Sequence, residues 1–236
     1  MPTLTELTRD FLAEQYAESP VLASSLGLTE FDGQLDDLSA VAFARRERAT
    51  AEWMAKFEAV EAASLSFDEA IDRDLVLASL RGRAIFDEWQ PWRRHPDTYL
   101  GPGLNGVFTL FLHRLRPEHE LVAAAAARLN GVAANLADGR RNLEPELVPQ
   151  ILLDRAIRQA RASARYAREL LPVEVADERL RTQLGEAGAG AADAFDQYAT
   201  FLEEMRPRAN GDWAFGEERY TAILRDAELL AVDTRA

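Results

Sequence analysis

The sequence predicts an all-α protein, and three observations lead to this prediction. Apolar residues recur at three- and four-residue spacings along nearly the whole 236-residue chain, which is the period of an α-helix. No stretch shows the strict alternation of apolar and polar residues that marks a β-strand. Breaks rich in proline and glycine separate the periodic stretches. We therefore expect a single domain over residues 1–236, with about eight or nine helices in long antiparallel hairpins and no significant β-sheet.

Several expected helices begin at side chains that can satisfy the free backbone N–H groups of a first turn. Thr3 with Glu6, and Ser66 with Glu69, match the capping box, in which hydroxyl and carboxylate each bond a backbone N–H group. The stretch SPVLASSLG at 19–27 predicts a short helix that begins with a serine and a proline and ends at a glycine. Long helices are expected at roughly 40–63, 67–89, 118–138, 146–171 and 177–205, and shorter ones near 4–17, 20–26, 104–115 and 217–230.

Two of the long helices carry apolar seams that advance by alternating steps of four and three residues. This repeat packs long helices at shallow angles, and small residues in mid-seam let a neighbouring helix approach closely. Breaks are expected at 91–103, 144–149 and 206–216. The seams consist of Ile71, Leu75, Ala78, Gly82, Ile85 and Trp89 in one helix, and of Leu153, Ile157, Ala160, Ala164, Ala167 and Leu171 in the other.

Composition excludes several classes of function. The chain has no cysteine, so a disulfide framework, a thiolate metal site and a cysteine nucleophile are excluded. A formal net charge of -13 repels phosphate backbones and anionic lipids, so neither nucleic acid nor a membrane is an expected partner. The N-terminal stretch lacks the basic and apolar segments of a signal peptide, and no run is long enough to span a membrane. A cytoplasmic location is therefore expected.

The three histidines lack the spacing of a helical metal site. His119 and Glu120 match the start of H-E-x-x-H, but Ala123 occupies the position of the second histidine. His95 and His113 have no histidine or carboxylate three or four residues away, which a shared helix face would require. The sequence therefore predicts no metal ligand, with a site assembled from separate helices as the alternative.

Motifs for catalysis or phosphate binding are also missing, so no catalytic residue is predicted. No serine lies in the G-x-S-x-G pattern of a nucleophile elbow. The glycines of GEAGAGAADAF at 185–195 follow a helical stretch, whereas a dinucleotide-binding loop follows a strand. We interpret these glycines as sites of close helix packing, with phosphate binding as the alternative.

One helix face and one aromatic cluster are candidates for binding. Arginines line the face opposite the second seam and could dock an acidic partner or ligand; the alternative is a solvated face with intrachain ion pairs. Aromatic residues around the 91–103 break could line a cleft or serve as core anchors. The arginines are Arg155, Arg158, Arg161, Arg165 and Arg168, and the aromatic residues are Trp89, Trp92, Tyr99, Phe108 and Phe111.

Five stretches, in order along nearly the whole chain, resemble the N-terminal half of the bacterial DUF885 family. These are loose helical patterns, so the resemblance depends on their order and spacing. It implies a helical, zincin-like metallopeptidase whose H-E zinc motif, followed by P-G-H, lies in the second half of a chain about twice as long. That half is absent from this sequence, so no catalytic or metal residue is transferred, and zinc is expected only together with a second half. The stretches are SPVLASSLGLTEFDGQLDDLS, FDEAIDRDLVLASLRGRAIFDEW, HPDTYLGPGLNGVFTLF, AAAARLNGVAANLADGRRNL and GDWAFGEERYTAIL.

Three hypotheses follow. In the first, the chain is the non-catalytic helical half of a metallopeptidase-like protein, forms one wall of a substrate cleft, and acts with a separately encoded or removed zinc-bearing half; this predicts an exposed apolar docking surface. In the second, it is a free-standing helical binding or scaffold protein that closes such a surface by homodimerisation. In the third, it is a metal-independent enzyme that uses carboxylates such as Asp72, Asp74 or Glu88, which requires a raised pKa in a concave pocket.

Under the first hypothesis, the residues that line the cleft are expected in or beside the long irregular loop of the helical body, because binding residues concentrate on loops held by a rigid scaffold. Ordinary packing is the alternative. The candidates are Trp92, His95, Tyr99, Asn105 and His113.

Overall fold

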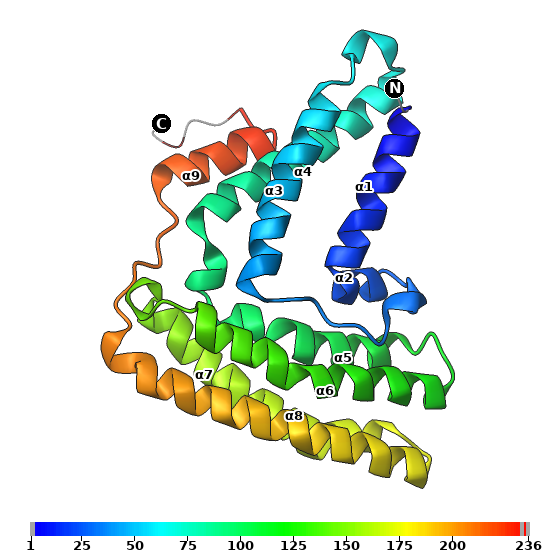
Figure 1. Ribbon diagram of the computed structural model, residues 1–236, viewed down its shortest axis with the longest axis vertical. Coiled ribbons are helices and arrows are strands. Elements are labelled where there is room, and N and C mark those ends of the chain that lie inside the picture. The colour runs from blue at the N-terminus through cyan, green and yellow to red at the C-terminus, as the bar shows by residue number, and fades with distance from the viewer. Residues whose placement is uncertain (1–2, 232–233, 235–236) are drawn as a thin grey trace. The chain divides into compact units, whose positions relative to one another are not determined.

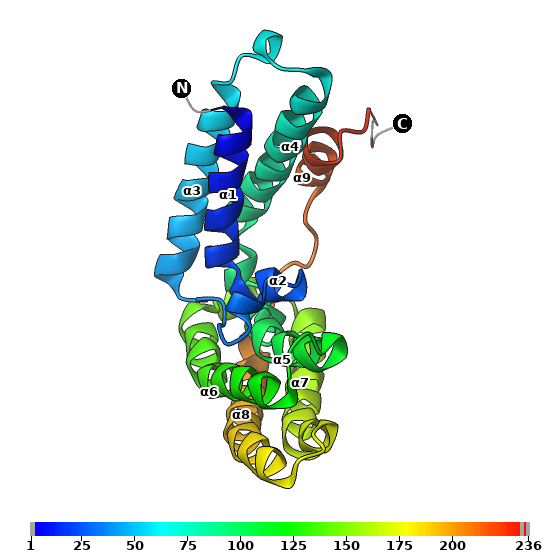
Figure 2. The same cartoon turned by 90° about the vertical axis from the view of Figure 1, so that its right-hand side faces the viewer.

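The computed structural model describes residues 3–231 and residue 234, and within them the chain is helical and contains no β-strand. The chain divides into two compact units, shown from two directions in Figures 1 and 2. Unit 1 comprises the chain up to Gln15, Val41–Pro91 and the chain from Ala214, and unit 2 comprises Tyr16–Ala40 and Trp92–Trp213. The all-α fold is confirmed, and the single domain stays a prediction.

Unit 1 is held together by large side chains from three helices. Phe11 makes edge-on contacts with Trp53 and Phe57, with ring centroids 5.5 and 5.6 Å apart. These rings, rather than close backbone contacts, join the helices. The helices of unit 1 are most of α1 (Leu4–Glu18), α3 (Ala40–Glu58), α4 (Phe67–Trp89) and α9 (Glu217–Ala222), which continues as a π-helical turn over Ile223–Ala227.

The C-terminal half of α4 packs against the chain around α9. A Cβ atom at Gly82 would lie 2.8 Å from the Ala227 Cβ, so only glycine permits this approach of the π-helical turn. Phe215 stacks on Phe86, with ring centroids 5.0 Å apart. The seam predicted along α4 is therefore buried at its C-terminal end, whereas Ile71 and Leu75 at its other end are exposed.

Unit 2 contains longer helices whose backbones approach more closely. Helix α8 packs along both α6 and α7, and small residues occupy the contacts. A Cβ atom at Gly188 would lie only 2.3 Å from the Ala167 carbonyl oxygen, so this glycine serves close packing, as the sequence predicts, whereas a Cβ atom at Gly190 would meet no neighbour. The helices of unit 2 are α2 (Pro20–Ser25), α5 (Gly101–His113), α6 (Glu118–Asn142), α7 (Gln150–Arg165) and α8 (Glu178–Met205).

The C-terminal ends of two helices in unit 2 differ from the sequence prediction for identifiable reasons. Helix α6 continues past Gly139, because this glycine serves a close approach: a Cβ atom there would lie 2.7 Å from the Tyr99 ring. Helix α7 ends at Arg165 and continues as a π-helical turn over Tyr166–Leu170. Pro172 follows, and its ring nitrogen cannot donate the hydrogen bond that would extend an α-helix.

A buried guanidinium connects the irregular segment before α3 to the helices of unit 2. Arg128 on α6 is fully buried, and its side chain donates to three backbone carbonyls. Nε donates to Gln34 at 3.0 Å, Nη2 donates to Phe31 at 3.2 Å, and Nη1 donates to Gly106 on α5. The Phe31 carbonyl also accepts from the Gln34 N–H group, and the Gly106 carbonyl also accepts from Thr109 Oγ1, so the guanidinium adds a charged donor at both.

Nearby carboxylates offset part of the energetic cost of burying this charged guanidinium. Burial lowers the pKa of Arg128, while the negative charges of Asp32 and Asp36 raise it. Asp32 is itself buried, and it accepts hydrogen bonds from Ser24 Oγ at 2.6 Å and from Arg116 Nε at 3.0 Å. The segment between α2 and α3, whose regular structure is a 3₁₀ turn over Thr29–Phe31, is thus held in place by charge-assisted hydrogen bonds.

We predict that Arg128→Met lowers the free energy of unfolding by roughly 3 kcal/mol, because it removes three charge-assisted hydrogen bonds at a buried position. Arg128→Lys should also destabilise, since one ammonium cannot reproduce the planar fork that reaches three acceptors. Urea unfolding followed by circular dichroism measures both effects. Arg158→Met, at an exposed position of α7, is the control. A loss no larger than that of the control would contradict this role of Arg128.

Candidate functional site

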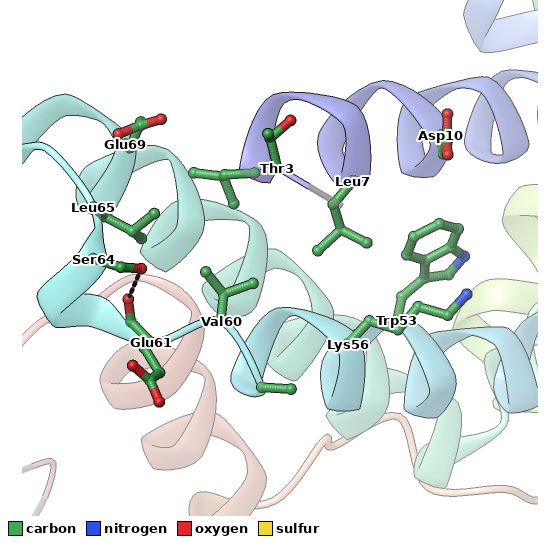
Figure 3. A pocket seen from close by; sticks show the side chains of 12 residues that line it. Thr3, Leu7, Asp10, Trp53, Lys56, Val60, Glu61, Ser64, Leu65 and Glu69 are labelled. Carbon is green, nitrogen blue, oxygen red and sulfur yellow. Dashed lines mark hydrogen bonds between the residues drawn. The ribbon is translucent and has the colours of Figure 1, made fainter. Parts of the chain in front are cut away.

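A groove in unit 1 opens between the start of α1, the end of α3 and the segment that joins α3 to α4 (Figure 3). Its volume is about 750 Å³. This lies within the range of roughly 300–1,000 Å³ that is typical of small-molecule sites. The lining residues are Thr3, Leu4, Leu7, Asp10, Trp53, Lys56, Ala59, Val60, Glu61, Ser64, Leu65 and Glu69.

The apolar walls of the groove exist because α3 ends early. The sequence predicts a helix to about residue 63, but α3 ends at Glu58, and a 3₁₀ turn over Ala62–Ser64 follows. The connecting segment then forms a wall opposite α1. Figure 3 shows Leu7 pointing from α1 toward Val60 and Leu65 on this segment.

One end of the groove combines an aromatic ring and a positive charge. Trp53 is buried, with 5% of its surface exposed, and it is held by the rings of Phe11 and Phe57. The Nζ atom of Lys56 lies 3.8 Å from the centroid of the Trp53 ring, which is a cation–π contact. Lys56 is the only lysine in the chain.

Both predicted capping boxes are confirmed, and each contributes a residue to the groove. The backbone N–H group of Thr3 donates to Glu6 at 2.8 Å, and the Glu6 N–H group donates back to Thr3 Oγ1. Ser66 and Glu69 form the same arrangement at the start of α4. Hydrogen bonds from the Ser66 hydroxyl and backbone N–H group lower the pKa of Glu69. The carboxylates of both boxes therefore serve as helix caps.

A second cluster of charged residues in unit 1 involves α3 and α4. Burial and the negative charge of Glu47 raise the pKa of Asp87 to about 6, against the opposing effect of Arg83 and Arg46. Asp87 Oδ2 and Glu47 Oε1 are buried and accept no hydrogen bond. Arg83 donates instead to Gln15. The charge of Glu47 thus adds to burial in disfavouring the ionised form of Asp87.

The carboxylates named in the third hypothesis are not in this cluster. Asp72, Asp74 and Glu88 are exposed on α4. The raised pKa belongs to Asp87, which is not among the residues that line the groove. The helical period could have identified Asp87 as a carboxylate on a buried helix face. Positions 77, 80 and 87 share one face of α4, and the first two hold buried leucines.

The five residues proposed for a cleft lie in different environments. Trp92 and Tyr99 are buried in unit 2, where the Tyr99 hydroxyl donates to the Trp92 carbonyl. His95 is half-buried, and burial lowers its pKa. Asn105 and His113 are exposed on α5. Trp92 and Tyr99 are core residues, as the packing alternative predicts, and a cleft formed by the other three stays a prediction.

Four of the five arginines on α7 and its extension form ion pairs. Arg161 reaches Asp196 and Glu203 on α8, Arg168 reaches Asp193 and Asp196, Arg165 reaches Glu169, and Arg155 reaches Asp97. Arg158 is exposed. These pairs are the ones that the intrachain alternative predicts, and an acidic partner would have to compete with them. Docking of such a partner stays a prediction.

No group of three or more His, Asp or Glu side chains among residues 3–231 and 234 is arranged to hold a metal ion. His119 is exposed in the first turn of α6, and its Nε2 lies 4.0 Å from Glu120 Oε1. Over the same part of the chain, every helix is too short or too polar to cross a bilayer. The cytoplasmic location stays a prediction, which fractionation of the source cells would test.

Apolar side chains are exposed on α2 and α5, which pack against each other in unit 2. Positions 108 and 112 are four residues apart and share one side of α5, and Leu115 follows just after the left-handed residue Arg114 that ends this helix. A Cβ atom at Gly27, just after α2, would lie 3.7 Å from the Leu115 side chain, which places the end of α2 beside them. The α2/α5 surface consists of Leu22, Leu26, Phe108, Leu112 and Leu115, each between 49% and 62% exposed.

We predict that Asp87→Asn stabilises the fold at pH 7.5 and has little effect at pH 4. The pKa of Asp87 is about 6 in the fold and about 3.8 when unperturbed, so the folded state binds more protons between these values. The destabilisation of the fold by the ionised Asp87 carboxylate is therefore absent below pH 4 and complete above pH 6. After a discount for partial exposure, we expect a gain of roughly 1–2 kcal/mol. Urea unfolding at both pH values measures it, with the exposed Asp72→Asn as control. Equal stability of the two variants at pH 7.5 would refute the destabilisation attributed to ionised Asp87 beside Glu47.

Comparisons with known proteins agree with the helical architecture. The family model described as "Bacterial protein of unknown function (DUF885)" matches residues 20–235. A solved structure from Shewanella oneidensis, described as "a putative lipoprotein of unknown function", shares the fold with a TM-score of 0.80 at 18% identity. The alignment covers 95% of this chain and 42% of that one, so this chain spans less than half the length of its structural neighbour. No curated protein matches the chain. The chain belongs to the DUF885 family of bacterial proteins of unknown function.

Proposed function

We propose that the chain is the non-catalytic helical half of a metallopeptidase-like DUF885 protein and forms one wall of its substrate cleft. The observation that carries this proposal is the α2/α5 surface. An exposed apolar row is unfavourable in water and is the feature that a docking face for a second half requires. The alignment covers 42% of the structural neighbour, so more than half of that longer chain lies outside the part that this chain matches. A second half of this kind would correspond to that remainder.

In this proposal the second half brings the zinc, and this chain contributes shape and apolar contact. The second half is either separately encoded or removed from a longer chain. Docking would bury the five side chains of the α2/α5 surface, each of which contributes roughly 25 cal/mol per Å² of apolar area removed from water. The arginine-rich face of α7 is less suited to this role, because most of its charges are already paired.

A second candidate function, a free-standing helical binding protein, is favoured by the groove in unit 1. A groove of about 750 Å³ with an apolar lining can hold a ligand without any second half. In that case the α2/α5 surface would be closed by a second copy of this chain in an isologous dimer. The two functions therefore differ in what covers the α2/α5 surface.

We predict that the chain, tagged and recovered from its source cells, carries a stoichiometric polypeptide with an H-E zinc motif and about one zinc ion per complex. Mass spectrometry identifies the polypeptide and metal analysis counts the zinc. The double substitution Leu112→Glu and Leu115→Glu should release both, because each places a charge in an apolar contact.

The matched control is Ile151→Glu, which changes an equally exposed apolar residue on α7 and should leave the complex intact. Helicity and Tm of all variants exclude unfolding as the cause of release. Recovery of the chain alone, without zinc, would overturn the proposal. A homodimer that the double substitution splits into monomers would instead favour the free-standing binding protein.

A further inference from the structure

We infer that the groove in unit 1 binds an aliphatic carboxylate, with the alkyl chain between Leu7, Val60 and Leu65 and the carboxylate at Lys56. This inference concerns a separate site and does not depend on the proposed function.

The charge of the groove points to an anionic head group. Among the described residues, the Lys56 ammonium forms its contact with the Trp53 ring and pairs with no carboxylate. Asp10 is paired with Arg9 at 3.0 Å, so its charge is already compensated. A carboxylate at Lys56 would therefore supply the missing counter-ion without displacing an existing pair.

The other two acidic residues of the groove do not oppose this head group. Glu69 is held by the hydrogen bonds of its capping box. The Glu61 carboxylate extends away from Leu7 in Figure 3. Both lie with Ser64 and Leu65 toward the other end of the groove, away from Lys56. Asp10, which is paired with Arg9, is the acidic residue on the Trp53 side of the groove.

The lining favours an alkyl chain over a peptide. The Thr3 hydroxyl donates to Glu6 at 3.0 Å, and the Ser64 hydroxyl donates to the Glu61 carbonyl at 2.7 Å. A peptide would bring N–H and C=O groups that need partners, and burying them unpaired is costly. An alkyl chain has no such requirement and gains from contact with Leu7, Val60 and Leu65.

Lys56 and Trp53 are also held in position before a ligand arrives. The rings of Phe11 and Phe57 fix the indole, and the indole face orients the ammonium above it. Such preorganisation lowers the entropy lost on binding. The N-terminal start of α1 and the start of α4 are each capped, so both edges of the groove are anchored by hydrogen bonds.

The single lysine allows a direct test. In protein labelled with ¹³C and ¹⁵N only in lysine, the Cε and Nζ signals of the NMR spectrum arise from Lys56. We expect titration with sodium decanoate to shift this signal in a saturable manner. Calorimetry should show affinity that rises about fourfold for each CH₂ group between hexanoate and decanoate, as expected for burial of the chain.

The variants separate charge from apolar contact. Lys56→Met should weaken decanoate binding about fivefold to tenfold, and Lys56→Arg should largely restore it. Leu65→Glu, whose folding is checked by Tm, should weaken it by at least about tenfold because it places a carboxylate beside the alkyl chain. Arg158→Met removes an exposed charge elsewhere and should bind decanoate normally.

Decyltrimethylammonium and a leucine-rich tripeptide with a free C-terminus complete the comparison, and both should bind more weakly than decanoate. Absence of decanoate binding at millimolar concentration would overturn the inference. Equal binding by Lys56→Met would do the same, as would a preference for the cationic probe. Tighter binding of the tripeptide would refute the aliphatic ligand and assign the groove to peptide C-termini.

Discussion

The guanidinium of Arg128 is the interaction on which the organisation of unit 2 depends. Its donors reach Gln34 and Phe31 in an irregular segment and Gly106 in α5, so one side chain from α6 defines how three parts of the chain meet. A hydrophobic side chain of similar volume would fill the space but would make none of these three charge-assisted hydrogen bonds.

The helices of the two units pack through side chains of different size, and the larger side chains of unit 1 leave the groove. In unit 2, alanine and glycine let α8 approach α6 and α7 so closely that little space remains. In unit 1, the rings of Phe11, Trp53 and Phe57 separate the helices. Beyond the last of these rings α3 ends, and no large side chain fills the space between α1 and the connecting segment. The aromatic cluster therefore both stabilises unit 1 and leaves a groove at its end.

The sequence predicts those features that depend on neighbouring residues. Capping boxes at Thr3 and Ser66, and the bounds of α4, follow from local hydrogen bonding and helical period. Features that depend on distant contacts could not be predicted in this way. Gly139 resembles a helix stop, but its role is set by Tyr99 and Tyr198, which reach it from other parts of the chain. Likewise, the groove requires α1 and the 59–65 segment to face each other, and the raised pKa of Asp87 requires Glu47 on another helix.

The net charge of the chain constrains what the groove can select. At -13, the long-range field disfavours any anion, including a carboxylate that approaches Lys56. Salt at physiological strength screens charges beyond about 8 Å, so acidic residues outside the groove have little effect on a carboxylate at Lys56. The attraction of one exposed ammonium is nevertheless small, and most of the affinity must come from burial of the alkyl chain against Leu7, Val60 and Leu65. The apolar wall therefore determines how tightly a ligand binds, and Lys56 determines which head group is accepted.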